Sequence, residues 1–307
     1  MACLSQLDGA LGAAPAPLPA RRRLGLATYL LFVKPHIVVT FVLVAVTGSF
    51  MAGAEGGKVA AGRLVAVAVS VALLGAAAEC WTNLIDRGID AVMPRTSGRC
   101  LPTGALTVHS ATALGTCLSA AGFAVAVTIG PLPTLFLALA MFNNVVVYSA
   151  LTKRATPWSV VLGSAVGPLT LFAGYTAVRA PIAFPALLAG LMVAAWVPVH
   201  IWALGVRYRA DYACASVPMA PVVWGRARLA LASLASSLAM GVLATGAFLS
   251  LGGALSRWLA AGVAVLSALA ALGSAVVPWR ERIATPLVKL LTAYLLLVLI
   301  SLIGLTA

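Results

Sequence analysis

The sequence contains few charged residues. Only 9% of its 307 residues are Asp, Glu, Lys or Arg, 62% are hydrophobic, and the mean hydropathy is +1.07. A soluble domain usually carries about 25% charged residues, so this composition excludes a water-soluble enzyme and a disordered chain. Aromatic residues are also scarce, at 7%, whereas Gly and Ala are abundant, as is typical of helices that pack closely in lipid. The sequence therefore predicts an all-α, polytopic membrane protein.

Acidic residues are scarcer still, since seven Asp and Glu stand against 20 Lys and Arg, for a net charge of +13. In a soluble protein this excess would suggest nucleic acid. In a membrane protein, positive residues gather on the cytoplasmic side of the spans, and no nucleic-acid partner is expected. The five cysteines show no CxxC spacing, which argues against a zinc site, and their odd number does not suggest a disulfide framework.

The chain begins with an Ala- and Pro-rich segment, 1–23, which is predicted to be a disordered tail, and continues as a single transmembrane domain, 24–307. Since about 20 apolar residues cross a bilayer as a helix, we expect nine spans. The predicted spans are 27–53, 62–83, 109–130, 132–151, 157–178, 182–206, 227–250, 256–278 and 283–306.

The basic residues predict the orientation of the spans. With the N-terminus in the cytoplasm, the inside segments hold fourteen Lys and Arg and the outside segments hold four. The positive-inside rule therefore predicts a cytoplasmic N-terminus and an external C-terminus. Two polar inside connectors, 87–108 and 207–226, follow the second and sixth spans, and this four-helix offset suggests an internal duplication.

Polar side chains recur at the end of the second predicted span. Glu79, Asn83, Asp86 and Asp90 follow one another at steps of 4, 3 and 4, so they fall within an arc of ~60° on a helix. Like charges at this spacing repel unless a cation lies between them, and carboxylate and amide oxygens are the ligands of Mg²⁺, which also binds substrate phosphates. The alternative is a solvated helix end with scattered carboxylates.

The sixth span shows a related pattern, because His200 precedes Asp211 by eleven residues, as Glu79 precedes Asp90. Eleven residues are close to three helical turns, so His200 and Asp211 would share a face if the helix were continuous. Each half of the chain would then present a carboxylate at the rim and a titratable group about 16 Å deeper. The alternative for His200 is a packing role.

Basic residues accompany both acidic segments. Arg95 and Arg99 follow the first acidic cluster, and Lys153 and Arg154 lie in a connector at the same membrane face. Arg and Lys beside a carboxylate-bound metal would form a diphosphate site, because Arg donates bidentate hydrogen bonds to phosphate. The alternative is that these are ordinary positive-inside charges.

These segments together resemble the UbiA-type intramembrane prenyltransferases and, among them, the protoheme IX farnesyltransferase (haem O synthase) family. The resemblance runs in one order from about residue 30 to the C-terminus. Its motifs are Lys-Pro at 34–35, Asn-Leu-Ile-Asp-Arg-Gly-Ile-Asp at 83–90, Met93 with Arg95, Thr96 and Arg99, Leu-Thr-Lys-Arg-Ala-Thr-Pro at 151–157, Trp-Val-Pro-Val-His-Ile-Trp-Ala-Leu at 196–204, and Asp-Tyr at 211–212 followed by Val-Pro-Met-Ala-Pro-Val-Val at 217–223.

The resemblance implies nine helices around a central cavity in a bacterial inner membrane, and transfer of a farnesyl group from farnesyl diphosphate to the vinyl group of haem b. It implies Mg²⁺ as the cofactor and a link to the assembly of terminal oxidases. The implied metal ligands are Asn83, Asp86, Asp90 and Asp211. The implied diphosphate contacts are Arg95, Arg99, Lys153 and Arg154, and the catalytic set is Asp86, Asp90, Asp211, His200 and Lys153.

The chain departs from the family pattern at Thr82, Gly88, Cys100 and Ala210. One alternative is therefore a UbiA-type enzyme that prenylates a quinone precursor or a natural product. A second is an ion-coupled transporter, although a transporter is expected to place its ionisable groups near the membrane midplane.

Glu79 lies about one turn deeper than Asn83 and is expected to be a lone carboxyl. It would accept a proton or hydrogen-bond the acceptor substrate. The alternative is a protonated Glu that is hydrogen-bonded to a neighbouring helix.

Overall fold

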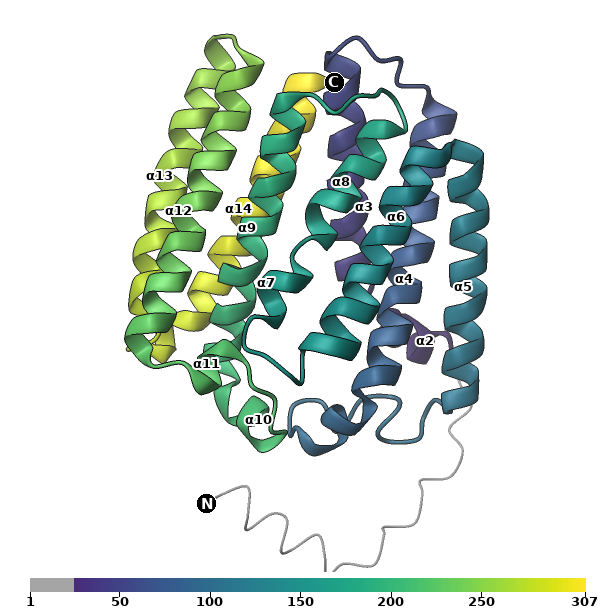
Figure 1. The fold of residues 1–307 in the computed structure, drawn as a ribbon, viewed down its shortest axis with the longest axis vertical. Coiled ribbons are helices and arrows are strands. Elements are labelled where there is room, and N and C mark those ends of the chain that lie inside the picture. Colours follow the sequence, from purple (N-terminus) through teal and green to yellow (C-terminus); the bar gives the residue numbers. More distant parts are fainter. Residues whose placement is uncertain (1–24) are drawn as a thin grey trace, which may run out of the picture.

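The computed structural model describes residues 25–307, which contain helices and no strand (Figure 1). Nine helical stretches in this range are long and apolar enough to cross a membrane, so the predicted number of spans and the all-α fold are confirmed. The tail predicted for residues 1–23 lies outside the described residues.

The spanning elements follow the predicted order along the chain. They are α3 (Pro35–Ala54), α4 (Ala61–Val92), α5 (Val108–Ile129), α6 (Pro131–Phe142) with the π-helix η1 (Asn143–Thr152), α7 (Ser159–Gly163) with α8 (Val166–Thr176), α9 (Phe184–Arg207), α12 (Arg226–Leu251), α13 (Ala254–Val276) and α14 (Ala284–Thr306). The shorter elements are α2 (Leu26–Val33), α10 (Arg209–Cys214), α11 (Ala220–Val223) and the 3₁₀ turn η2 (Glu281–Ile283).

Two boundaries differ from the prediction in ways that affect the candidate site. The first apolar run is divided, because Pro35 cannot donate the backbone hydrogen bond that would continue α2, and α3 begins there instead. Between these two helices Lys34 adopts φ 49° and ψ 70°, a left-handed conformation that costs a residue with a Cβ about 1–2 kcal/mol. Helix α4 continues past Gly88 to Val92 instead of ending near residue 83.

Helices α3 and α8 approach each other at small residues. A Cβ on Gly174 would lie 1.8 Å from the carbonyl oxygen of Ala45, and a Cβ on Gly48 would lie 2.1 Å from that of Leu171. The Ser49 hydroxyl donates a hydrogen bond across this contact to the Gly174 carbonyl, at 2.9 Å. Glycine is required here because the two backbones touch, as is common where helices associate in lipid.

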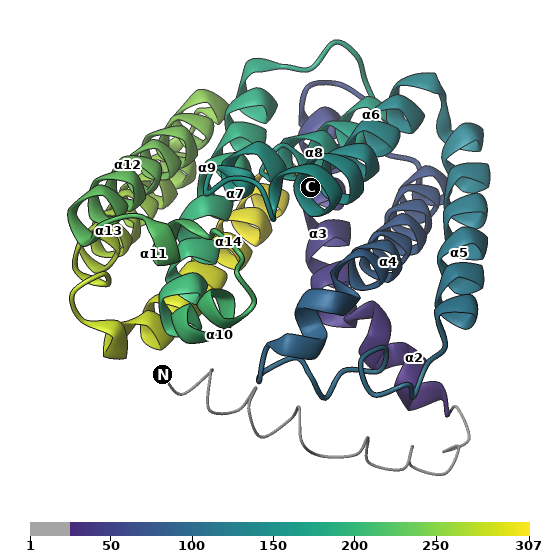
Figure 2. The same ribbon diagram turned by 60° about the horizontal axis from the view of Figure 1, so that its bottom comes forward.

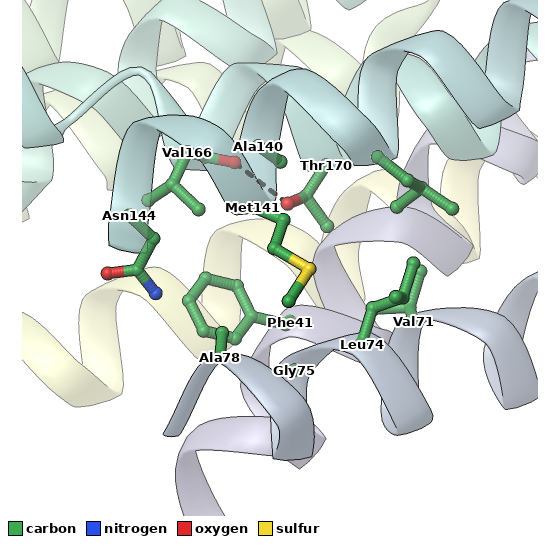
Figure 3. A pocket seen from close by; sticks show the side chains of 11 residues that line it. Phe41, Val71, Leu74, Gly75, Ala78, Ala140, Met141, Asn144, Val166 and Thr170 are labelled. Carbon is green, nitrogen blue, oxygen red and sulfur yellow. Dashed lines mark hydrogen bonds between the residues drawn. The ribbon is translucent and has the colours of Figure 1, made fainter. Parts of the chain in front are cut away.

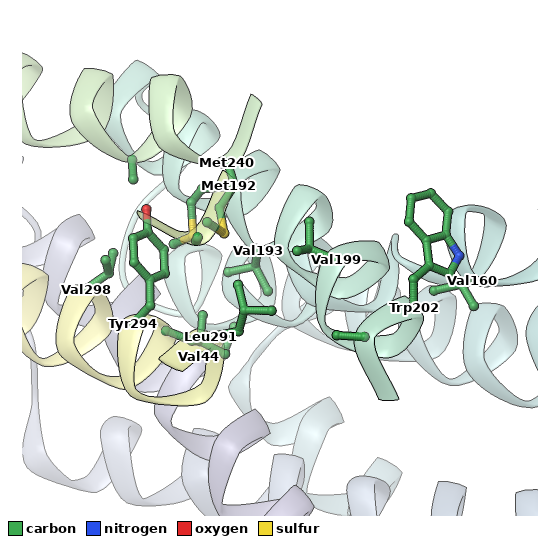
Figure 4. Packing of buried hydrophobic residues seen from close by; sticks show 14 of the residues in the cluster. Val44, Val160, Met192, Val193, Val199, Trp202, Met240, Leu291, Tyr294 and Val298 are labelled. Atoms are coloured by element: carbon green, nitrogen blue, oxygen red, sulfur yellow. The ribbon is translucent and has the colours of Figure 1, made fainter. Parts of the chain in front are cut away.

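Helix α9 is held in the largest apolar cluster of the described residues, between α12 and α14 (Figure 4). Met192 of α9, Met240 of α12 and Tyr294 of α14 are all fully buried there. The Trp196 indole donates a hydrogen bond to the Leu291 carbonyl at 2.7 Å. This packing fixes the helix that carries His200.

The polar connectors gather at one end of the bundle. The segments after α4, η1 and α9, and the turn before α14, all lie at the lower end in Figure 1, and Figure 2 brings this end forward. The short links between α3 and α4, α5 and α6, and α12 and α13 lie at the other end. The two motif segments predicted from the sequence therefore meet on the same side of the molecule.

Candidate functional site

The last part of α4 carries four polar side chains on its buried side. Glu79, Asn83, Asp86 and Asp90 are each between 5% and 7% exposed. Burial of a carboxylate is costly unless it is paired with an opposite charge or hydrogen-bonded, so each of these residues requires a partner from another element.

The partners are cations. All four salt bridges within residues 25–307 lie at this site, and each joins one carboxylate to one basic side chain. The pairs are Glu79 with Lys34, Asp86 with Lys153, Asp90 with Arg99, and Asp211 with Arg95. The structure thus brings together six of the residues predicted from the sequence: Asp86, Asp90, Asp211, Arg95, Arg99 and Lys153.

Lys153 lies where η1 ends, and its Nζ donates to Oδ2 of Asp86. The other carboxylate oxygen of Asp86 is buried and has no hydrogen-bond partner. The Lys153 ammonium also lies 5.7 Å from the centre of the Tyr148 ring. Burial alone would lower the pKa of Lys153, but Tyr148 and Asp86 outweigh it and raise the pKa above its ordinary value. The ammonium therefore keeps its charge at neutral pH.

The connector after α4 joins the two acidic motifs. Arg99 donates from Nη1 to both oxygens of Asp90, at 2.9 and 2.8 Å, and the Thr96 hydroxyl donates to the Asp90 carbonyl. Nε of Arg95 lies 3.8 Å from the Asp211 carboxylate. One short segment thereby holds the carboxylate of α4 and reaches that of α10.

Arg154 follows Lys153 after η1 and contacts a different part of α4. Its guanidinium donates to the backbone carbonyl of Ile85 at 2.5 Å, and it borders shallow grooves beside Leu84 and Gly88. It forms no ion pair with the buried carboxylates among the described residues.

His200 lies in α9 two residues after Pro198, an interior proline of this helix. Its imidazole stacks on the Trp196 indole, with ring centres 4.4 Å apart and planes at 21°. The Nδ1 atom is buried without a hydrogen-bond partner. The continuous helix on which a shared face of His200 and Asp211 depended is absent, because α9 ends at Arg207 and α10 begins after Tyr208, which has φ −110° and ψ 29°.

The expectation that Glu79 is a lone carboxyl is wrong. Nζ of Lys34 lies 2.5 Å from its Oε2, and the same Nζ donates to Oδ1 of Asn83 at 3.0 Å. The sequence analysis placed Lys34 in the Lys-Pro motif and predicted no role for it. Its position within an apolar run could have indicated the ion pair, since a cation at that depth needs a partner.

The donor set fits a divalent cation of the hard, oxygen-binding class. Asn83, Asp86, Asp90 and Asp211 offer amide and carboxylate oxygens, which Mg²⁺ prefers, and one buried oxygen of Asp86 is without a partner. The described residues contain no cluster of three His, Cys, Asp or Glu close enough to hold an ion by themselves. In this structure the carboxylates of Asp86, Asp90 and Asp211 are each paired with a basic side chain instead.

Comparisons with known proteins identify the family and the fold. The profile of the UbiA prenyltransferase family matches residues 41–299. Protoheme IX farnesyltransferase 1 of Shewanella loihica is 35% identical over 210 residues, which are 68% of this chain and 67% of that protein. A UbiA homologue from Archaeoglobus fulgidus bound to DMAPP and Mg²⁺ has the same fold, with a TM-score of 0.68 at 18% identity over 90% of this chain and 99% of that chain. The apo UbiA homologue from Aeropyrum pernix K1 gives a TM-score of 0.69 at 21% identity over 85% and 96%.

The fold and the site define an integral membrane protein with a charged centre at one end of nine spanning helices. The chain belongs to the UbiA prenyltransferase family. The resemblance read from the sequence motifs is thereby confirmed.

Proposed function

We propose that this protein transfers a farnesyl group from farnesyl diphosphate to a vinyl group of haem b, forming haem O. The observation that carries the proposal is the set of carboxylate–cation pairs formed by Asp86, Asp90 and Asp211 at one end of an apolar bundle. Such a set offers both charge signs that a metal–diphosphate requires, next to helices that suit an isoprenoid tail. The similarity to protoheme IX farnesyltransferases supports haem b as the acceptor.

In this proposal the three pairs of Asp86, Asp90 and Asp211 separate when the substrate binds. Asn83, Asp86, Asp90 and Asp211 would hold Mg²⁺, and the basic partners would turn toward the phosphate oxygens. Bound there, Mg²⁺ would act as a Lewis acid that stabilises negative charge on the diphosphate. Those basic partners are Lys153, Arg99 and Arg95, with Arg154 as a further contact.

The side chains of the site would favour ionisation of the substrate. Positive groups aimed at the leaving diphosphate stabilise the charge that develops as the allylic C–O bond breaks. The allylic carbon then bonds to the vinyl group, and water adds to the resulting cation and loses one proton. We propose that His200 contacts the acceptor, because its buried Nδ1 has no protein partner.

An apolar pocket lies within the membrane-spanning part of the bundle (Figure 3). It is lined from α3, α4, α6, η1 and α8 by side chains that include Phe41, Leu74, Ala78, Asn144 and Thr170. Ala78 immediately precedes Glu79 on α4, so the pocket lies on the membrane-interior side of the charged part of this helix. We propose that the farnesyl tail extends in this direction, away from bulk water.

We further propose that residues 24–307 act as one domain in the bacterial inner membrane, with the charged end and the N-terminus in the cytoplasm. The excess of Lys and Arg at that end supports this orientation. A farnesylated haem made there would be supplied to the assembly of terminal oxidases.

Mass spectrometry of extracted haem tests the proposed function. Cells that lack haem O would express the wild-type chain, Asp86→Asn, or Glu55→Gln, whose residue lies at the opposite end of the bundle, just after α3. We expect farnesylated haem with the wild type and Glu55→Gln, and little with Asp86→Asn. Absence of farnesylated haem from membranes that contain the wild-type protein would refute haem b as the acceptor, and a prenylated quinone precursor would identify another.

A further inference from the structure

The proposed reaction leaves the Lys34–Glu79 ion pair without a role, although this pair lies deepest along α4. Lys34 is the single residue between α2 and α3, and its backbone is left-handed. Its side chain is 22% exposed and that of Glu79 is 10% exposed. A strained backbone that directs a lysine onto a buried carboxylate is a feature that commonly accompanies function.

Asn83 is fixed by hydrogen bonds at both ends of its amide. Oδ1 accepts from Nζ of Lys34 at 3.0 Å, and Nδ2 donates to the carbonyl of Phe32 at 2.9 Å. A flipped amide would place its NH₂ group against an ammonium and its oxygen against a carbonyl, so both bonds would be lost. The Lys34 ammonium and the last turn of α2 therefore select one orientation of this side chain.

We propose that Lys34 is a positioning residue that fixes Asn83 with its amide oxygen available to the divalent cation, and that Glu79 holds Lys34 in place. This inference rests on the proposed Mg²⁺–diphosphate function. An amide oxygen has two lone pairs, so Oδ1 can accept from Lys34 and still bind a cation. Glu79 serves as counter-ion to Lys34, so that the lysine does not add a net positive charge beside the metal.

The arrangement distinguishes Lys34 from the other basic residues of the site. Lys153, Arg99 and Arg95 each pair with one of the proposed metal ligands, and these pairs would separate when substrate binds. Lys34 pairs with Glu79, which is not among the proposed ligands, so this pair can persist. Lys34 therefore acts on the metal through Asn83, as groups that orient the ligands of a metal do.

Metal-dependent binding of a substrate analogue tests this role without turnover. The purified full-length protein would bind radiolabelled farnesyl thiolodiphosphate, whose C–S bond resists ionisation, over a range of Mg²⁺ concentrations. We expect Lys34→Met to raise the half-saturating Mg²⁺ concentration about tenfold or more, the size of effect typical for partners of metal ligands. Lys34→Arg, which keeps the charge and the donor, should show a clearly smaller rise than Lys34→Met. Lys58→Met, at the other end of the bundle, is the matched control.

A second background shows whether Lys34 acts through Asn83. In an Asn83→Ala protein, Lys34→Met should cause no further change, because the side chain that it orients is absent. Wild-type Mg²⁺ dependence in Lys34→Met would overturn this inference but not the proposed function. The same would follow if Lys34→Met raised the half-saturating Mg²⁺ concentration equally in the Asn83→Ala protein, because Lys34 would then contact the diphosphate directly. If Lys34→Met does not yield folded protein, Lys34→Gln takes its place. Failure of the wild-type protein to bind the analogue in a Mg²⁺-dependent manner would instead overturn the proposed function, and this inference with it.

Discussion

Replacing Lys153 with Met separates two consequences of the Asp86–Lys153 pair. The substitution removes the ammonium but keeps a long, flexible side chain. It leaves the Asp86 carboxylate, whose residue is 6% exposed, without its cation, while its second oxygen already lacks a partner. On the proposed function it also removes a contact to the diphosphate. We therefore expect losses of both stability and substrate affinity.

The two losses have different sizes. Removal of one partner from a buried ion pair costs about 3–5 kcal/mol, because an uncompensated charge remains. The site lies at the end of the bundle, so the lower part of this range applies. A hydrogen bond to a charged group contributes about 1.5–3 kcal/mol, which corresponds to about a 10- to 150-fold rise in the Kd for the diphosphate, since 1.4 kcal/mol is a factor of ten.

The double variant Asp86→Asn with Lys153→Met tests this reasoning. It removes both charges, so we expect thermal stability in detergent to return most of the way to that of the wild type. Affinity for farnesyl thiolodiphosphate should stay low, because neither the cation nor the metal ligand is restored. Recovery of both quantities in the double variant, or wild-type affinity in Lys153→Met alone, would show that Lys153 does not bind the diphosphate.

Three other predictions follow from the site and the fold. Asp211→Ala should remove most Mg²⁺-dependent prenyl transfer, measured in membranes, and near-normal turnover would contradict a site built from both motifs. Cys100, a partly exposed thiol after α4, should resist a membrane-impermeant maleimide in intact cells and react after lysis, whereas labelling in intact cells would reverse the proposed orientation. Gly174→Ala should lower the thermal midpoint in detergent, because overpacking costs about 1–3 kcal/mol and its Cβ would overlap the Ala45 carbonyl. Gly262→Ala, with nothing within 4 Å, is its control and should not lower the midpoint.

The sequence was sufficient to predict the parts of the molecule that depend on local pattern. Hydropathy predicted nine spans because each must cross the same apolar layer, and nine are present in the described residues. The motifs predicted the family, which the comparisons confirm. The roles assigned to the site residues stay predictions, although the structure brings Asp211 beside Arg95 at the end of α4.

The sequence was not sufficient to predict side-chain contacts that depend on packing between distant segments. Glu79 and Lys34 are 45 residues apart, and hydropathy does not show which helices adjoin. The expected common face of His200 and Asp211 required a continuous helix, and a single residue, Tyr208, breaks it. Periodicity is reliable only as far as the helix extends.

On the proposed function, the ion pairs would explain how one site can be buried and still accept a highly charged substrate. Buried carboxylates without partners would repel one another along α4, and buried cations without partners would be equally unfavourable. Pairing them makes the site nearly neutral before the substrate binds. A metal–diphosphate brings both signs of charge, so the carboxylates can take the cation while the basic side chains take the phosphate. If each group of the three separating pairs exchanges one charged partner for another while Lys34 stays on Glu79, the site would not have to bury an unpaired charge at any stage of binding.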